Sequence, residues 1–155
     1  MGTSLEVSLI SDNESTAESA FFHIFEMLKS YEKTFSRFIE GSELSRLNHN
    51  KHMKVSGSFI EATSIAKKLH ADTCGVFNPL LQVSNLGYDR SFENLTSKLA
   101  PLACDPYDIN MTRVSIDTSN SMISIGKDQK LDYGGFLKGF LAEKIAISLS
   151  HFKGI

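Results

Sequence analysis

Residues 132–139 (DYGGFLKG) place an acidic residue, two glycines and a lysine where a predicted strand gives way to a predicted helix. The strand covers residues 130–131, and the helix runs from about residue 135 to residue 149. Unpaired N–H groups at a helix N-terminus attract anions, and glycines let a large ligand approach the backbone closely. Lys138 would neutralise a phosphate oxygen, and Asp132 would accept a hydrogen bond or help to hold a hard cation. The same pattern also fits a plain glycine turn that opens an amphipathic helix.

Hydrophobic periodicity predicts the other elements. Residues 5–9 alternate as a half-buried strand, whereas residues 14–35 have apolar side chains at helical spacing and predict a long helix with a buried aromatic face. A short helix over residues 42–48 would be capped by Ser42 and stopped by Asn48. Residues 51–56 are a polar link or a short strand. The later segments predict a helix from residue 59 to about residue 74, a short helix over residues 79–86, an irregular segment over residues 87–111 and a hairpin over residues 114–125.

The length, net charge and apolar content of the chain limit the class of protein that it can be. Its 155 residues form a single domain or part of a larger one. The formal net charge is −2 and no basic run is present, so nucleic acid is not an expected partner. No apolar run has the length of a membrane span, and the residues after Met1 do not resemble a signal peptide. Cys74 and Cys104 are either a disulfide or, as we favour, buried free thiols.

Four segments, in this order, resemble the FAD:protein FMN transferase family, which is also called the ApbE family. Residues 1–3 (MGT) are similar to the opening of that family, and residues 35–38 (FSRF) followed by 42–48 (SELSRLN) are similar to its next element. Residues 75–79 (GVFNP) resemble its GAFDP turn, and residues 132–139 resemble its DLGGIAKG motif. SELSRLN together with the spacing of the glycine motif makes the resemblance specific, and it spans nearly the whole chain.

The resemblance implies an α+β fold, similar to the T-fold, in which a mixed sheet and helices frame a cleft for a flavin dinucleotide. It implies FAD as the donor substrate and Mg²⁺ as the cofactor, with the backbone carbonyl of Gly135 as one metal ligand. By analogy, contacts with FAD fall on Met1, Phe38, Val76, Phe77, Asn78, Asp132 and Lys138.

The implied activity is protein flavinylation, in which FMN passes from FAD to a Thr or Ser hydroxyl of an acceptor protein and AMP is released. Such a reaction requires charge neutralisation on both phosphates and a nucleophile in line with the leaving group. With water as the nucleophile, the same site would be an FAD pyrophosphatase. The other hypotheses are a non-catalytic flavin-binding module and a fragment that needs another chain, and a homodimer is a candidate assembly. Members of the family often lie in the periplasm or are anchored to a membrane, whereas the residues leave the compartment open.

Three departures from the family pattern affect these expectations. Phe38 stands where the family usually has tyrosine, so a hydroxyl contact is lost while an aromatic surface remains. Asn78 stands where the family usually has aspartate, which replaces a charged acceptor by a neutral group that also donates. The resemblance covers the N-terminal half of the family's domain. We therefore expect the remaining magnesium ligands and part of the flavin-binding wall, which the family's second half supplies, to be missing from this chain.

Overall fold

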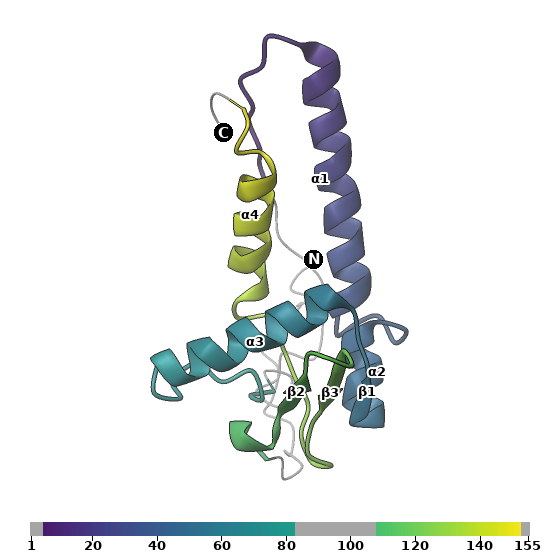
Figure 1. Cartoon of the computed structure of the whole chain (residues 1–155), viewed down its shortest axis with the longest axis vertical. Helices are drawn as coiled ribbons and strands as arrows, with labels where there is room; N and C mark the ends of the chain where they lie inside the picture. The colour runs from purple at the N-terminus through teal and green to yellow at the C-terminus, as the bar shows by residue number, and fades with distance from the viewer. Residues whose placement is uncertain (1–4, 83–107, 153–155) are drawn as a thin grey trace, which may run out of the picture.

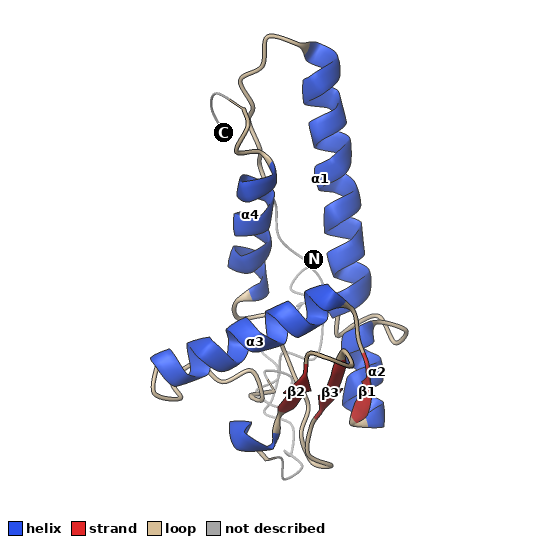
Figure 2. Ribbon diagram, in the orientation of Figure 1, coloured by secondary structure: helices blue, strands red, loops and turns tan. Residues whose placement is uncertain are grey.

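The computed structural model describes residues 5–82 and 108–152. Within these residues the fold is α+β (Figures 1 and 2), which confirms the predicted class. The described elements are α1 (Glu14–Phe35), α2 (Glu43–Asn50), β1 (His52–Lys54), α3 (Gly57–Asp72), the 3₁₀ turn η3 (Met111–Arg113), β2 (Ser115–Asp117), β3 (Met122–Ser124) and α4 (Leu137–Ser148). None of the described helices is long and apolar enough to span a membrane.

The three described strands form a small sheet in the order β1-β3-β2. Both pairings are antiparallel, and Ile123 of β3 lies between Met53 of β1 and Ile116 of β2. The predicted hairpin is confirmed as β2 and β3. The resemblance implied a mixed sheet, whereas all the strand pairs among the described residues are antiparallel.

Helix α2 lies beside β1, and the other helices extend away from the strands (Figures 1 and 2). Helix α3 crosses next to the strands, and α1 and α4 rise beyond it as a pair. The main core joins the sheet, α3 and the lower part of α1, with fully buried Phe59 and Ile123 among its members. A second apolar cluster fills the space between α1 and α4, around Ile24, Leu141 and Ile145. The fold therefore consists of a sheet-and-helix body with a two-helix extension.

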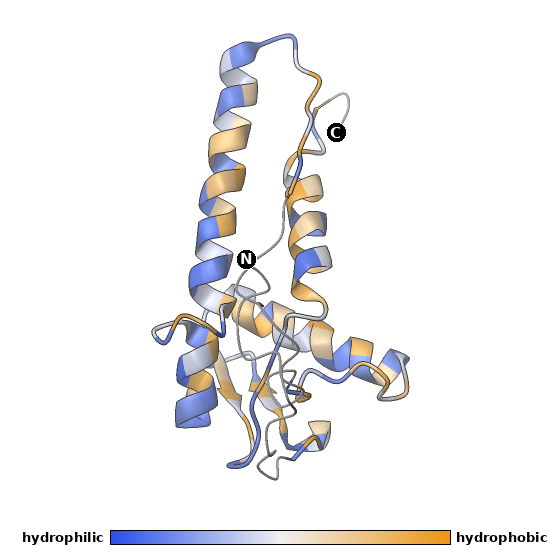
Figure 3. Cartoon of the chain, turned by 180° about the vertical axis from the view of Figure 1, so that it is seen from behind, coloured by the Kyte–Doolittle hydropathy of each residue, from blue (hydrophilic) through white to orange (hydrophobic). Residues whose placement is uncertain are grey.

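Helix α1 forms over the predicted residues, and Asn13 caps it by accepting a hydrogen bond from the Thr16 N–H. Its aromatic face is only partly buried, which corrects the prediction. Phe21, Phe22 and Phe25 are all exposed, and Figure 3 shows hydrophobic bands along α1 beside the hydrophilic ones. Ile24, on the same stretch of α1, is buried against Leu141 and Ile145 of α4, so the exposed rings lie beside the contact with α4 and not within it.

Several element boundaries differ from the prediction. Residues 5–9 form no strand, because they lie along the cluster between α1 and α4, where Val7 and Leu9 contact it, instead of beside the sheet. Residues 79–82 form no helix and residues 130–131 form no strand, since both segments run as turn or coil between packed elements. Residues 83–107 lie outside the described residues, and they include Cys104 and the remainder of the short helix predicted over residues 79–86. Cys74 is a free and exposed thiol, not a buried one.

Helix α2 is capped by Ser42 as predicted, since the Ser45 N–H donates to its hydroxyl at 3.0 Å. The helix does not stop at Asn48 but continues to Asn50. It ends through Lys51, which has a left-handed backbone with φ of 66°, while the Asn48 side chain forms tertiary contacts. After α3, Cys74 (φ 49°) and Gly75 (φ 85°) are both left-handed, and the Gly75 N–H donates to the His70 carbonyl at 2.8 Å. Gly75 thus takes part in ending the helix, as predicted, but Cys74 occupies the first left-handed position.

Candidate functional site

The glycine turn over residues 132–136 connects a coil to α4 and is fixed by local hydrogen bonds. The Gly134 N–H donates to Asp132 Oδ1 at 2.9 Å, and the Leu137 N–H donates to the Tyr133 carbonyl at 2.9 Å. This aspartate-centred turn explains the glycine, because a Cβ on Gly134 would lie 3.2 Å from Asp132 Oδ1. Gly134 and Gly135 are both exposed, so the backbone of the turn faces outward.

Helix α4 begins two residues later than predicted, at Leu137, and its N-terminus has no side-chain cap. Its first turn contains no acidic residue but does contain Lys138, which is exposed. A cation in the first turn opposes the helix dipole, and a bound anion there would offset both charges. The N-terminus of α4 therefore has the electrostatic character of an anion site.

The turn over residues 77–79 lies directly against the glycine turn. The Asp132 N–H donates to the Pro79 carbonyl at 2.7 Å, and the rings of Phe77 and Phe136 meet edge to face with 5.7 Å between centroids. A Cβ on Gly135 would lie 3.5 Å from the Phe77 ring. The two turns that resemble the family's motifs are thus adjacent, although more than 50 residues separate them in the sequence.

The carboxamide of Asn78 is used inside the protein. Its Nδ2 donates to the Ile109 carbonyl at 2.9 Å, and its Oδ1 accepts from the Leu80 N–H at 2.9 Å. Only 9% of Asn78 is exposed. An aspartate, which the family usually has here, could accept from Leu80 but could not donate to Ile109.

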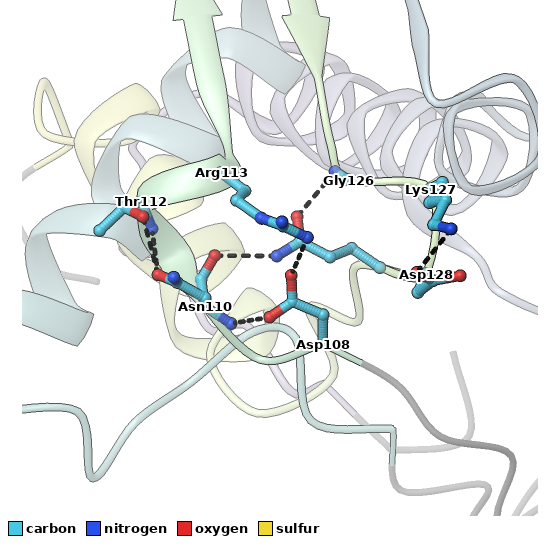
Figure 4. A network of polar contacts seen from close by, with 8 residues as sticks. Asp108, Asn110, Thr112, Arg113, Gly126, Lys127 and Asp128 are labelled. Carbon is cyan, nitrogen blue, oxygen red and sulfur yellow. Dashed lines mark hydrogen bonds and ion pairs between the residues drawn. The ribbon is translucent and has the colours of Figure 1, made fainter.

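The segment that accepts from Asn78 is itself held by a polar network (Figure 4). Arg113 pairs with Asp108 at 2.9 Å, and the Gln129 Nε2 donates to the Asn110 carbonyl at 2.8 Å. Gln129 is fully buried and its Oε1 accepts from the Gly126 N–H at 2.8 Å. The network therefore holds residues 108–113, which include the Ile109 carbonyl that accepts from Asn78.

An ion pair connects the glycine turn to the end of α1. Arg37 Nη1 lies 2.8 Å from Asp132 Oδ2, with 27% of the Arg37 side chain and 10% of the Asp132 side chain exposed. The Arg37 guanidinium also lies 4.8 Å from the centre of the Phe38 ring, and Phe38 is 55% exposed. Asp132 thus bridges Arg37 and the Gly134 N–H through its two oxygens.

Two further contacts hold the glycine turn from beneath. The Asn48 carboxamide donates to the Leu131 carbonyl at 2.8 Å and accepts from the Leu131 N–H at 2.7 Å. The buried Tyr133 hydroxyl lies 2.7 Å from the Thr63 hydroxyl, which donates to the Phe59 carbonyl, so Tyr133 is the donor to Thr63. Burial raises the pKa of Tyr133 well above its usual range, which keeps this hydroxyl protonated.

The structure brings some of the predicted site residues together. Phe77, Asn78, Asp132 and Gly135 lie in the two adjacent turns, and Phe38 joins them through Arg37. Lys138 follows on the first turn of α4. Val76 is 87% exposed and lies at the outer edge of its turn. Met1 lies outside the described residues.

The side chains of the described residues do not build a magnesium site by themselves. The described residues contain no cluster of three or more His, Cys, Asp or Glu side chains that would hold a metal ion. Both oxygens of Asp132 already contact protein donors. The described residues therefore offer a metal no more than single oxygens, such as the carbonyl of the exposed Gly135.

Comparison with known proteins decides the family. The model of the ApbE family matches residues 1–155. The chain belongs to the ApbE family. No curated protein matches this chain closely enough to count as a relative.

Solved structures of ApbE proteins share the fold. The apo flavinyl transferase ApbE of Pseudomonas stutzeri aligns with a TM-score of 0.72 at 16% identity, over 89% of this chain and 48% of its own. The ApbE protein of Thermotoga maritima aligns at 0.68 and 22% identity, over 90% and 48%. The flavin transferase ApbE of Vibrio cholerae aligns at 0.66 and 17% identity, over 94% and 47%. The chain thus spans about half the length of these ApbE structures.

Sequence reasoning identified the two turns but missed the residues that hold them, namely Arg37, Asn48 and Tyr133. All three lie inside or beside the motifs that carry the family resemblance. The signal was therefore present as residue identity, but their partners are 70 to 95 positions away and no spacing rule connects them.

The two hydrogen bonds of the Asn78 carboxamide predict what happens when aspartate, the family's usual residue, replaces it. Asn78→Asp places a carboxylate oxygen against the Ile109 carbonyl, so we expect the free energy of unfolding at pH 7 to fall by about 1–3 kcal/mol. Urea unfolding followed by circular dichroism measures this change. Asn13→Asp is the matched control, because Asn13 only accepts a hydrogen bond at its helix cap and aspartate caps equally well. Equal stabilities of the two variants would contradict the role assigned to Asn78.

Proposed function

We propose that this protein takes part in protein flavinylation, the transfer of FMN from FAD to a Thr or Ser hydroxyl of an acceptor protein with release of AMP. One observation carries the proposal. The Phe77–Asn78 turn, the glycine turn and Phe38 lie together, next to an uncapped helix N-terminus that has Lys138 in its first turn. This arrangement offers aromatic surface, exposed backbone and positive charge, which suit a flavin dinucleotide.

The proposed chemistry follows from these groups. The acceptor hydroxyl oxygen bonds to the phosphorus of the FMN moiety, the bond from that phosphorus to the oxygen shared with AMP breaks, and the hydroxyl proton is released. The N-terminus of α4 and Lys138 would bind phosphate oxygens and stabilise the charge that moves onto the leaving AMP. Phe38 and Phe77 would flank the aromatic rings of FAD, and each Asp132 oxygen retains a second lone pair for a donor of the ligand.

We include Mg²⁺ in the proposal because a divalent cation neutralises phosphate oxygens during phosphoryl transfer. Gly135 is the proposed ligand from this part of the chain. The remaining ligands would come from outside the described residues, since the described side chains do not complete a site.

The direct test is a titration of the purified chain with FAD, with and without Mg²⁺, followed by flavin fluorescence. The same samples are assayed for AMP and, with an added Thr-containing acceptor protein, for covalently bound flavin. Binding with magnesium-dependent AMP release and a flavinylated acceptor supports the transferase. AMP release without flavinylation favours the pyrophosphatase, and binding without AMP release favours the flavin-binding module. Failure to bind FAD would exclude all three flavin-linked functions for this chain.

A further inference from the structure

We propose that Arg37 contacts the diphosphate of the bound dinucleotide and that Asp132 holds its guanidinium in place for this contact. The proposal deepens the function proposed above and rests on it. It gives Arg37 the role of a ligand-binding residue and adds to Asp132 the role of positioning Arg37.

The backbone at Arg37 is held firmly. The Ser36 N–H caps α1 by donating to the Glu32 carbonyl at 3.0 Å, and the buried Ser42 hydroxyl donates to the Ser36 carbonyl at 2.7 Å. Ser42 also caps α2, so a single side chain ties the end of one helix to the start of the next. The loop from which Arg37 projects is therefore fixed on both sides.

The side chain of Arg37 is held as well. Asp132 Oδ2 accepts from its guanidinium at 2.8 Å while Asp132 Oδ1 accepts from the Gly134 N–H at 2.9 Å. The guanidinium and the exposed glycine backbone thus share one carboxylate and lie next to each other. The Phe38 ring, 4.8 Å away, adds a cation–π contact on one side.

Arg37 is the more exposed partner of the ion pair. The Asp132 side chain is 10% exposed and the Arg37 side chain is 27% exposed, so the cation is the partner nearer to solvent. A guanidinium presents its N–H donors in a planar fork, which matches phosphate geometry.

Charge balance points to the same ligand. Asp132 pairs with Arg37, whereas Lys138 on α4 is exposed and forms no ion pair with the residues that the structure describes. A diphosphate brings two negative charges to the glycine turn. Arg37 on one side and Lys138 on the other would then provide one cation for each phosphate.

The test compares the FAD affinities of four variants by flavin fluorescence. Arg37→Met is expected to weaken FAD binding about 10- to 100-fold, because it removes a charged hydrogen bond to the ligand. Arg37→Lys keeps the charge but loses the fork, so we expect a smaller loss. Arg46→Met is the matched control, since Arg46 is exposed on α2, and it should bind FAD like the unsubstituted chain.

The fourth variant separates ligand contact from simple neutralisation of Asp132. Arg37→Met combined with Asp132→Asn removes both charges of the pair. If Arg37 contacts the diphosphate, FAD affinity stays low in the double variant; a recovery to the original affinity would overturn the proposal. Unchanged affinity in Arg37→Met would also overturn it while leaving the proposed function intact. Failure of the unsubstituted chain to bind FAD would overturn both the role of Arg37 and the proposed function. If Arg37→Met fails to fold, Arg37→Lys decides, and an unchanged affinity there counts against the contact.

Discussion

Replacing Phe59 with alanine is expected to lower the free energy of unfolding by about 3–5 kcal/mol, the usual cost of emptying a large aromatic site in a core. Phe59 is fully buried on α3, stacks on Phe35 with 5.2 Å between centroids, and lies 5.6 Å from Tyr133. The substitution therefore leaves a cavity where α1, α3 and the glycine turn meet. Urea unfolding monitored by circular dichroism gives the difference.

The matched control for this experiment is Phe22→Ala. Phe22 belongs to the same residue type but is 68% exposed on α1, so its loss should change the free energy of unfolding by less than about 0.5 kcal/mol. If the two alanine variants unfold at the same urea concentration, the core described around Phe59 is wrong.

The second large effect is expected for Asn48→Ala. Both hydrogen bonds of the Asn48 carboxamide go to the backbone of Leu131, which is 1% exposed. Alanine would leave a buried N–H and a buried carbonyl without their partner, at about 1–3 kcal/mol each, so we expect a total loss of about 2–6 kcal/mol. Because Leu131 precedes Asp132, the same substitution should also loosen the glycine turn.

Hydrogen exchange of the Leu131 and Gly134 amides checks the second part of this prediction. Both amides should exchange faster in Asn48→Ala than in the unsubstituted chain. Asn50→Ala is the control, since Asn50 is exposed at the end of the same helix and its side chain forms no hydrogen bond with a described residue. Normal protection of Leu131 in Asn48→Ala would show that the carboxamide does not hold the segment that precedes the glycine turn.

Features that depend on a few neighbouring residues were predictable from the sequence, whereas contacts between distant segments were not. Helix α1, the Ser42 cap, the Gly75 turn and the β2–β3 hairpin were predictable, because periodicity and capping act over a few residues. Residues 5–9 alternate as a strand would, yet they pack on the α1–α4 cluster, since alternation alone does not select the partner surface.

The candidate site follows the same division. The motifs around Phe77 and Asp132 indicated which residues matter, and the structure places them in adjacent turns. Asn48 was predicted to stop a helix on its local preference, but its carboxamide serves a tertiary role that the helix geometry permits. No pattern in the sequence indicated the pairing of Arg37 with Asp132, because such pairs depend on how separate elements meet.

The contacts that hold the glycine turn have a consequence for how the protein is made. Arg37 and Asp132 are 95 positions apart, Asn48 and Leu131 are 83 apart, and Thr63 and Tyr133 are 70 apart. During synthesis, α1, α2 and α3 leave the ribosome long before any of these partners exists. The hydrophobic surfaces of α1 and α3 therefore stay exposed until the last fifth of this chain has been synthesised. Contacts between residues so far apart in the sequence also slow folding. Nascent chains of this protein are accordingly expected to need protection from aggregation until the glycine turn has emerged.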